Sequence, residues 1–390
     1  MANMEDDKYE GPRIIDDLDL ERAAELRRST FFPQEKSFEE GFRTWPIALS
    51  EEYAHNTIAM FHDGVPVSAL SWVTRNFIML GHGLRMGFIG GVCTHPEHRN
   101  RGLASALLSA CINIMREDGV DFVYISGARP LYYRAGANHV GCSRSFRLNA
   151  DMAYDKRRFP VSLREATIED ISLLARLYQR EPTRFIRPIS DYLLTLKHGY
   201  CSGKACTFQL VESDGEPVGY LILTSPLEVD GFVVRQVLEF CGERGSVLSA
   251  LLLLTSELHT GHELYVEVPR HDPLCRKLIA LGFSGEPVAT SGTFKALDFC
   301  RTMSKLLPYF ESQVFPEFLR KLEFCESGQR YLVRSAEGYL EIEGETNMLW
   351  ALLGAPPEQA VQNLRVYGSM QALMDRCLPL PIPSLYLNMV

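Results

Sequence analysis

The spacing of apolar residues changes between residues 88 and 112, and the change predicts a strand, a turn and a helix. Residues 88–92 form a short apolar run bounded by glycines, which favours a buried strand. From Leu103 the apolar residues recur every three or four positions, so Leu103, Leu107 and Ile112 fall on one face of a helix. The turn between them carries histidines and arginines. A helix that follows such a turn attracts anions, because its first backbone amides are unpaired.

Other segments of the first 150 residues alternate between strand and helix patterns. Strands are predicted at 12–15, 57–61, 65–73 and 122–126, and a turn at 62–64 joins the second to the third. Asp19 is expected to cap a helix that ends near Arg28. This order predicts antiparallel strands that lead into a parallel strand–helix–strand unit, with the charged turn at its crossover.

The middle of the chain repeats the pattern of its beginning. Residues 163–178 resemble 14–27, and the segment 215–224 resembles 64–73. A repeat of this length predicts a duplicated domain. The turn at 240–246 corresponds to the charged turn of the first copy, but it lacks the proline and the arginine–glycine spacing. We therefore expect a second copy that has lost the anion-binding chemistry.

From about residue 291 the pattern differs from both copies. It predicts a helix that runs through Phe318 and Leu319, a hairpin around Gly338, and a short apolar helix at 348–353 that ends at Gly354. The final segment, 381–390, is apolar and contains two prolines. Loose tails are usually polar, so this composition is typical of a segment that docks on the protein.

Composition and charge narrow the class of protein. A chain of 390 residues with 46% hydrophobic residues is typical of a globular protein with two or three domains. The net charge of −9 argues against nucleic-acid binding, so an anionic ligand needs a locally basic site. The residues expected to supply that charge are Arg85, His95, His98, Arg99 and Arg101.

Cysteine usage and the apolar runs bear on the compartment. The ten cysteines show no metal-binding or disulfide spacing, which predicts reduced thiols and no metal. The N-terminus resembles no signal peptide, and the longest apolar run is too short to cross a bilayer. We therefore expect a cytoplasmic protein that does not contact membranes.

The charged turn and its flanks resemble the pyrophosphate-binding motif of the GNAT superfamily of acetyl-CoA-dependent N-acyltransferases. The motif reads Arg99-x-x-Gly102-x-Ala104, with a strand and Pro96 before it and a helix after it. The resemblance implies acetyl-CoA as the acetyl donor. Its pyrophosphate is then expected on Arg99, Asn100, Arg101, Gly102, Leu103 and Ala104, and its pantetheine arm beside Val92, Cys93 and Thr94. Gly102 lacks the Cβ that would keep a phosphate away from the amides.

A second element of the same superfamily follows the strand at 122–126. Residues 131–136 (Leu-Tyr-Tyr-Arg-Ala-Gly) resemble its Phe-Tyr-x-x-x-Gly-Phe element, with Ala137 where the family has Phe. The match places Tyr132 at the position of the general acid that protonates the departing CoA thiolate. A phenol with a pKa of ~10 holds its proton near neutral pH, which suits this role. The alternative is a packed aromatic pair of Tyr132 and Tyr133.

The whole chain resembles the enhanced intracellular survival acetyltransferases, which join two GNAT domains to a sterol-carrier-like domain. The implied fold is α/β (α+β), with a catalytic GNAT domain at 1–153, a degenerate GNAT-like domain at 154–290, and a sterol-carrier-like domain with the C-terminal tail at 291–390. The implied activity is acetyl transfer to an amine of a small molecule or peptide by direct attack on the thioester. Members of this family often form hexamers, which implies a homo-oligomer. The alternatives are a non-catalytic sensor of acetyl-CoA or a lipid, and an acyltransferase of the N-myristoyltransferase type.

The motifs do not identify the base that accepts the proton of the amine. Many GNAT enzymes carry a glutamate on the strand before the motif, but residues 86–94 contain no carboxylate. Glu97 lies in the basic turn, a poor position for a base, and His95 and His98 titrate in a suitable range but lie in the same turn. The family resemblance implies the terminal carboxylate of Val390 as the base. Water, a histidine, and a tail that only packs on the protein remain the alternatives.

Overall fold

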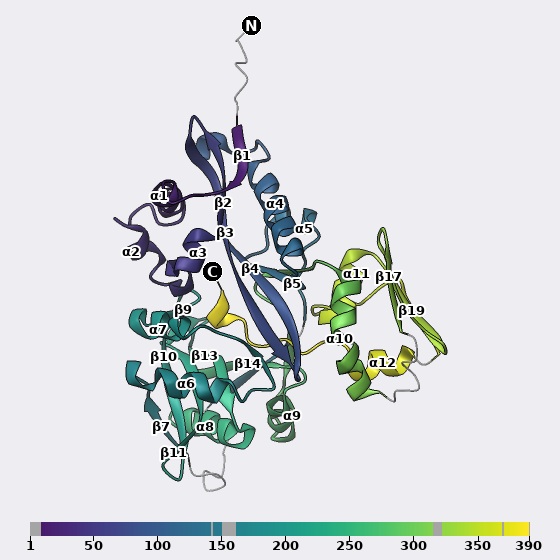
Figure 1. The fold of residues 1–390 in the computed structure, drawn as a ribbon. Coiled ribbons are helices and arrows are strands. Elements are labelled where there is room, and N and C mark those ends of the chain that lie inside the picture. Colours follow the sequence, from purple (N-terminus) through teal and green to yellow (C-terminus); the bar gives the residue numbers. More distant parts are fainter. Residues whose placement is uncertain (1–8, 142, 150–160, 315–321, 369, 390) are drawn as a thin grey trace.

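The computed structural model describes residues 9–141, 143–149, 161–314, 322–368 and 370–389. Two large sheets follow one another, and a smaller sheet stands beside them (Figure 1). The mixed α/β class expected from the sequence is confirmed. Among the described residues, no helix combines the length and apolarity that crossing a membrane requires.

The first sheet contains the parallel strand–helix–strand unit that the sequence predicts. Its order is β1 (Tyr9–Ile14), β2 (Thr57–His62), β3 (Val65–Met79), β4 (His82–Thr94), β5 (Phe122–Ile125) and β16 (Thr293–Ala296), with β8 (Thr183–Phe185) paired to β3. β1 to β4 are antiparallel neighbours, whereas β4 and β5 run parallel and are connected through α4 (Leu103–Glu117). The crossover therefore lies where the charged turn predicted it.

Helices cover both faces of the first sheet, because neighbouring residues of a strand point to opposite faces. Cys93 of β4 packs with α1 (Leu20–Phe31), whereas Val92 packs with α4. The short helices α2 (Phe38–Phe42) and α3 (Glu51–His55) lie beside α1, and α5 (Pro130–Arg134) shares the core of α4. Asp19 precedes α1 but its carboxylate does not cap the helix. Instead it accepts a hydrogen bond from Arg13 at 2.6 Å, so the predicted cap was wrong, and α1 extends beyond Arg28 to Phe31.

The second sheet repeats this arrangement with different strands at its edges. Its order is β15 (Glu286–Val288), β6 (Ser143–Asn149), β14 (His262–Pro269), β13 (Phe232–Gly242), β11 (Glu216–Thr224), β10 (Lys204–Ser213) and β7 (Ser162–Glu165), with β9 (Tyr200–Cys201) and β12 (Leu227–Val229) added to β10 and β13. β13 and β14 run parallel and are connected through α8 (Arg244–Ser256), as β4 and β5 are through α4. The remaining helices are α6 (Ile171–Tyr178), α7 (Ile189–His198) and α9 (Pro273–Ala280).

The two sheets exchange strands across the expected domain boundaries. β6 lies before residue 153 in sequence but pairs with β14 of the second sheet. β16 lies after residue 290 but pairs with β5 of the first sheet. The sheets therefore do not coincide with the segments bounded at residues 153 and 290, because one strand near each boundary joins the other sheet.

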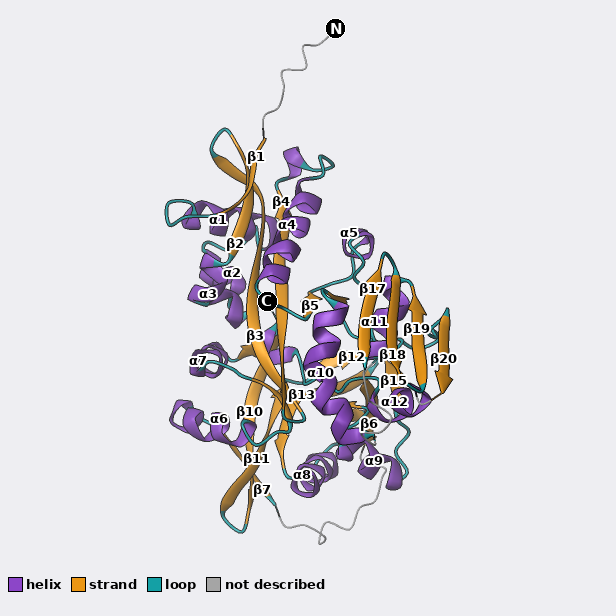
Figure 2. Ribbon diagram, turned by 45° about the vertical axis from the view of Figure 1, so that its right-hand side comes forward, coloured by secondary structure: helices purple, strands orange, loops and turns teal. Residues whose placement is uncertain are grey.

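The last part of the chain forms a four-stranded sheet of β17 (Glu323–Ser327), β18 (Arg330–Ser335), β19 (Gly338–Glu343) and β20 (Leu364–Gly368), with α10 (Phe299–Gln313), α11 (Glu345–Leu353) and α12 (Met370–Cys377). Figure 2 shows α10 between the long strands of the first sheet and the small sheet. The predicted hairpin and the helix before Gly354 are confirmed. Phe318 and Leu319 lie outside the described residues.

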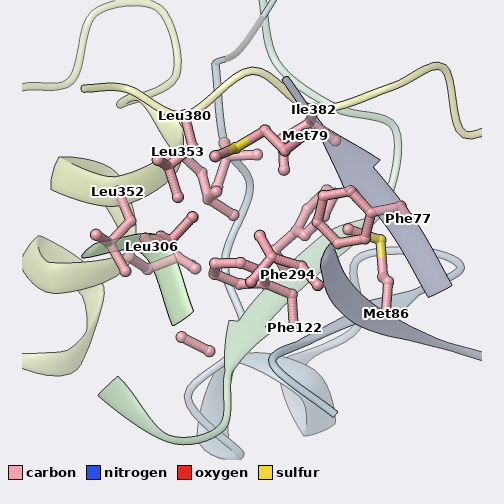
Figure 3. Close-up of a cluster of buried hydrophobic side chains, with 14 of the residues drawn as sticks. Phe77, Met79, Met86, Phe122, Phe294, Leu306, Leu352, Leu353, Leu380 and Ile382 are labelled. Atoms are coloured by element: carbon pink, nitrogen blue, oxygen red, sulfur yellow. The ribbon is translucent and has the colours of Figure 1, made fainter. Parts of the chain in front are cut away.

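One apolar core joins the first sheet to this last part. Phe77 and Met79 of β3 lie in the same cluster as Leu352 of α11 and as Leu380 and Ile382 of the C-terminal segment (Figure 3). The C-terminal segment therefore leaves α12 inside a core and then runs between the two large sheets (Figure 1).

Candidate functional site

The N-terminus of α4 is open to an anionic ligand. Its N-cap residue, Gly102, has φ +80°, and a Cβ placed there would meet no atom within 4 Å. Asn100 also has a positive φ, of 62°. Within the described residues, the backbone amides of Gly102, Leu103 and Ala104 donate no hydrogen bond, and no side chain caps the helix. Unpaired amides and the positive end of a helix dipole favour anions, so this helix start is the candidate phosphate site.

The arginines near this turn differ in what they contact. Arg99 is exposed, and its Nε donates to the Thr94 carbonyl at 3.2 Å. Arg101 is exposed and lies over the Tyr9 ring, 5.7 Å from its centre. Arg85 instead donates to the Asp118 carbonyl at 2.8 Å, near the other end of β4. The expectation that Arg85 contributes charge to the turn was therefore wrong, because β4 is much longer than the predicted strand.

Three side chains before the turn lie close enough to hold a metal ion. Potential ligand atoms of His95, Glu97 and His98 lie within 4.8 Å of one another in the described part of the chain. His98 Nδ1 hydrogen-bonds the Tyr9 hydroxyl at 2.9 Å. Burial, and then the neighbouring His62, lowers the pKa of His98, which favours the neutral ring. The absence of a resident metal stays a prediction.

The strands β4 and β5 diverge beside the turn. Their pairing ends at Ile89 and Ile125, followed by one hydrogen bond from the Ser126 amide to the Ile89 carbonyl at 3.0 Å. Beyond this point the edge of β4 that faces β5 has no strand partner among the described residues. β4 also carries a bulge here, since its register against β3 shifts next to Gly91, which has φ +59°.

The predicted pantetheine-binding residues lie on this free edge. The side chains of Val92 and Cys93 are buried in the cores on opposite faces of the sheet. Thr94 hydrogen-bonds Ser68 at 2.8 Å through its hydroxyl. These side chains already pack in the cores or hydrogen-bond within the protein. A ligand at this edge would therefore contact the backbone N–H and C=O groups of β4.

Tyr132 is buried in the same core cluster as Val92 and Leu103, so it lies on the face of the first sheet that α4 covers. Only 2% of Tyr132 is exposed, and within the described residues its hydroxyl makes no hydrogen bond. Burial raises the pKa of Tyr132, which the nearby Arg129 partly opposes. Tyr133 is 39% exposed. Of the two tyrosines, Tyr132 is the buried one, and it is also the one that the family resemblance places at the position of the general acid.

The C-terminal segment is docked between the sheets as far as it is described. The Ser384 hydroxyl donates to the Leu238 carbonyl at 3.1 Å, and the Gln236 amide donates to the Tyr386 hydroxyl at 2.9 Å. Met389 is buried, with its sulfur 3.7 Å from the Tyr124 hydroxyl of β5. The segment also lines a cavity of about 770 Å³ at the ends of β13 and β14. Val390 lies outside the described residues.

The equivalent helix start in the second sheet is closed. Glu243 is the N-cap of α8, and its carboxylate accepts hydrogen bonds from the Gly245 and Ser246 amides at 2.8 and 2.7 Å. These amide bonds lower the pKa of Glu243. Arg244 pairs with Glu181 at 2.5 Å and with Asp272 at 2.7 Å. The carboxylate of Glu243 therefore takes the amides that a phosphate would need.

Comparison with known proteins assigns a family to the first part of the chain. Residues 12–140 match the model of the acetyltransferase (GNAT) domain family. This segment is therefore similar to GNAT acetyltransferase domains. It includes the open turn, the divergence of β4 and β5, and Tyr132. The chain matches no curated protein.

Solved structures share the fold of the chain beyond the GNAT domain. A GCN5-related N-acetyltransferase from Kribbella flavida has a TM-score of 0.63 at 16% identity, over 100% of both chains. One from Anabaena variabilis ATCC 29413 has a TM-score of 0.64 at 12% identity, over 95% of this chain and 96% of that chain. Eis1 from Mycobacterium abscessus has a TM-score of 0.54 at 15% identity, over 75% of each chain. At these identities the likeness concerns the fold.

Two features of the site were missed by the sequence reasoning. Arg27 of α1 is buried, although a charged residue in a helix normally indicates the solvated face. It follows the buried Ala23 by four positions, which places the two residues on one face of the helix, and this signal is present in the sequence. Glu243 immediately precedes a helix, where a negative charge is favoured by the helix dipole, although Asp rather than Glu is the usual acidic N-cap.

Proposed function

We propose that the protein is an acetyl-CoA-dependent N-acetyltransferase, that its GNAT domain is the catalytic one, and that an amine of a small molecule or peptide is the acceptor. The observation that carries this proposal is the contrast between two related helix starts. At α4 the amides are unpaired and Gly102 leaves the approach open, whereas at α8 Glu243 occupies them. A ligand with a pyrophosphate fits the first and is repelled by the second.

The residues of the site can serve each part of an acetyl transfer. Acetyl-CoA supplies a thioester whose carbonyl carbon forms a bond with the amine nitrogen while the bond to sulfur breaks. The amides at Gly102–Ala104, with Arg99 and Arg101, would hold the pyrophosphate, and backbone groups of Val92 and Thr94 the pantetheine arm. Tyr132 would give its phenolic proton to the leaving thiolate. Its raised pKa keeps that proton in place at neutral pH. Holding two reactants in place would account for much of the remaining rate gain.

We further infer that the terminal carboxylate of Val390 accepts the proton of the amine. The support is the position of its covalent neighbour, because Met389 is buried against Tyr124 of β5. Polar contacts from the second sheet hold the preceding residues Ser384 and Tyr386. β4 itself offers no carboxylate.

We propose that residues 154–290 are a degenerate GNAT-like domain and residues 291–390 a sterol-carrier-like domain, as in the enhanced intracellular survival acetyltransferases. The closed start of α8 supports the first assignment. A cytoplasmic homo-oligomer without nucleic-acid or membrane partners completes the proposal. The described cysteines are all free thiols, which suits a reducing compartment.

The test is thiol release from acetyl-CoA with a panel of amines, including aminoglycosides, polyamines and a lysine peptide. Acetyl-CoA binding with amine-dependent thiol release is expected. Binding without turnover for any amine would instead identify a sensor, and no binding would refute the proposal.

A Gly-Ser extension after Val390 tests the base, with the same extension before Met1 as its control. The C-terminal extension should leave acetyl-CoA binding intact and lower turnover severely at neutral pH. The rate should recover partly at higher pH, because amines with a pKa of ~10 then become neutral without help. Wild-type turnover in the extended chain would exclude Val390 and leave water or a histidine as the base.

A further inference from the structure

The GNAT domain contains a buried guanidinium that has no carboxylate partner in the part of the chain that the structure describes. Arg27 of α1 is 1% exposed. Its Nε donates to the Ala23 carbonyl at 3.2 Å, and its Nη1 donates to the hydroxyls of Thr57, at 3.3 Å, and Ser71. No carboxylate forms an ion pair with it among the described residues. Its hydrogen-bond acceptors in the described ranges are all neutral, so no carboxylate there compensates the positive charge.

Other buried guanidiniums of this chain are compensated. Arg75 is 3% exposed and pairs with Asp191 at 3.1 Å and with Glu52. The side chain of Arg187 is 1% exposed and pairs with Glu239 at 2.5 Å. Burying a charge without an ion-pair partner lowers the stability of the folded protein. Two buried arginines are paired and Arg27 has no carboxylate partner among the described residues, so a function of its charge would explain why this arginine is buried here.

Arg27 lies directly behind the bulge of β4. A Cβ added to Gly91 would come 3.3 Å from the Arg27 Cδ and would clash with the Tyr53 hydroxyl. Tyr53 is fully buried and its hydroxyl has no hydrogen-bond partner among the described residues. The guanidinium lies 5.3 Å from the centre of the Tyr53 ring. Arg27 and Tyr53 therefore fill the space behind Gly91, and no larger residue fits at the bulge.

If acetyl-CoA binds as proposed, its thioester lies beside the β4 bulge. The pyrophosphate at Gly102 and the pantetheine arm along Thr94 and Val92 leave the acetyl end beside Gly91, the next residue of the free edge. The field of Arg27 already acts on this part of β4, since it opposes the effect of burial on the pKa of the Cys93 thiol.

We propose that Arg27 is an electrostatic positioning residue: it holds the β4 bulge and places an uncompensated positive charge behind the acetyl carbonyl. As the amine nitrogen bonds to the carbonyl carbon, the carbonyl oxygen gains negative charge. That charge returns to carbon when the bond to sulfur breaks, and the sulfur then takes the Tyr132 proton. Arg27 keeps its own protons throughout and acts by its field, as preorganised charges do in acyl transfer. This inference rests on the proposed function.

The experiment compares Arg27→Gln and Arg27→Lys in the full chain, with Arg28→Gln as the matched control. Arg28 is the next residue, but it pairs with Glu25 at 2.5 Å. With the fastest amine of the panel, Arg27→Gln should lower kcat by about tenfold, less than the 10²–10³-fold loss of a direct oxyanion donor. Arg27→Lys should recover part of the loss, and Arg28→Gln should change nothing.

A vibrational measurement separates the field of Arg27 from its packing. A non-reactive ketone analogue of acetyl-CoA, ¹³C-labelled at its carbonyl, should show a lower carbonyl stretching frequency when bound to the wild type. The shift should shrink in Arg27→Gln and persist in Arg27→Lys. Equal shifts and equal kcat in all variants would overturn the role of Arg27. A wild type that does not bind the analogue would overturn the proposed function instead.

A second variant covers the case in which Arg27→Gln does not fold. Ser71→Asp places a carboxylate beside Arg27, giving the guanidinium a partner while cancelling its charge. It should reproduce the smaller carbonyl shift and the loss of kcat, and wild-type values in this variant would also overturn the proposal.

Discussion

Introducing charge at Gly102 tests the phosphate site directly. Gly102 has φ +80°, and a Cβ at this position would have no neighbour within 4 Å, so a side chain fits there but must adopt a left-handed backbone. That backbone costs about 1–2 kcal/mol for an ordinary residue and less for Asp or Asn. Gly102→Asp and Gly102→Asn should therefore unfold at similar denaturant concentrations, slightly below the wild type.

The two variants should differ strongly in acetyl-CoA affinity. The aspartate imitates the second sheet, where the Glu243 carboxylate occupies the amides of α8. A carboxylate ~6 Å from a phosphate, at an effective dielectric constant of about 20, is repelled by about 3 kcal/mol. This corresponds to roughly 100-fold weaker binding of Gly102→Asp, whereas Gly102→Asn loses only what steric hindrance costs.

Isothermal titration calorimetry with CoA and acetyl-CoA at two salt concentrations measures both effects. The difference between the Asp and Asn variants should shrink at 1 M salt, where the screening length falls to about 3 Å. Equal affinities of the two variants at low salt would show that no phosphate binds at the start of α4. That result would remove the basis of the proposed cofactor site.

Two further predictions concern the acid and the stability of the second sheet. Tyr132→Phe should lower kcat by about 10²-fold with acetyl-CoA affinity unchanged, whereas Tyr133→Phe should be mild. Because burial raises the pKa of Tyr132, wild-type turnover should decline only above its ordinary pKa of ~10, a decline that Tyr132→Phe should lack. The reverse ranking of the two tyrosines would assign the acid to Tyr133. Glu239→Ala should lower the free energy of unfolding by about 3–5 kcal/mol, because buried Arg187 loses its partner. Urea unfolding measures this, and a loss below ~1 kcal/mol would contradict it.

Local patterns predicted the elements well where one strand or helix has a continuous apolar face. The strand at 88–92 is part of β4, and the helix from Leu103 is α4. β4 is longer than predicted because Gly83, Arg85 and Gly87 interrupt the apolar pattern before residue 88 while the strand continues through them. The exchange of β6 and β16 between sheets was not predicted, since pairing between distant strands leaves no trace in local spacing.

The site was predictable where a short motif fixes the backbone. Gly102 lies at the helix start with a positive φ, as its place in the motif suggests. Side chains whose role depends on burial were not predictable. Arg27 and Arg85 are the same residue type, and the sequence does not reveal what surrounds each side chain. Arg27 lies behind the β4 bulge, whereas Arg85 contacts the loop after α4. Such positions follow from packing between elements that are far apart in the chain.

The second sheet contributes to the first through the tail, although its own anion site is closed. Leu238 and Gln236 of β13 hydrogen-bond the segment that ends at Met389, and Met389 lies against Tyr124 of β5. The position of Met389 thus depends on how the two sheets are held together. β8 pairs with β3 across that boundary, and the buried ion pair between Arg75 of β3 and Asp191 of α7 spans it. The second sheet therefore positions the C-terminal segment against β5 of the first sheet, even though the start of its own α8 is closed to anions.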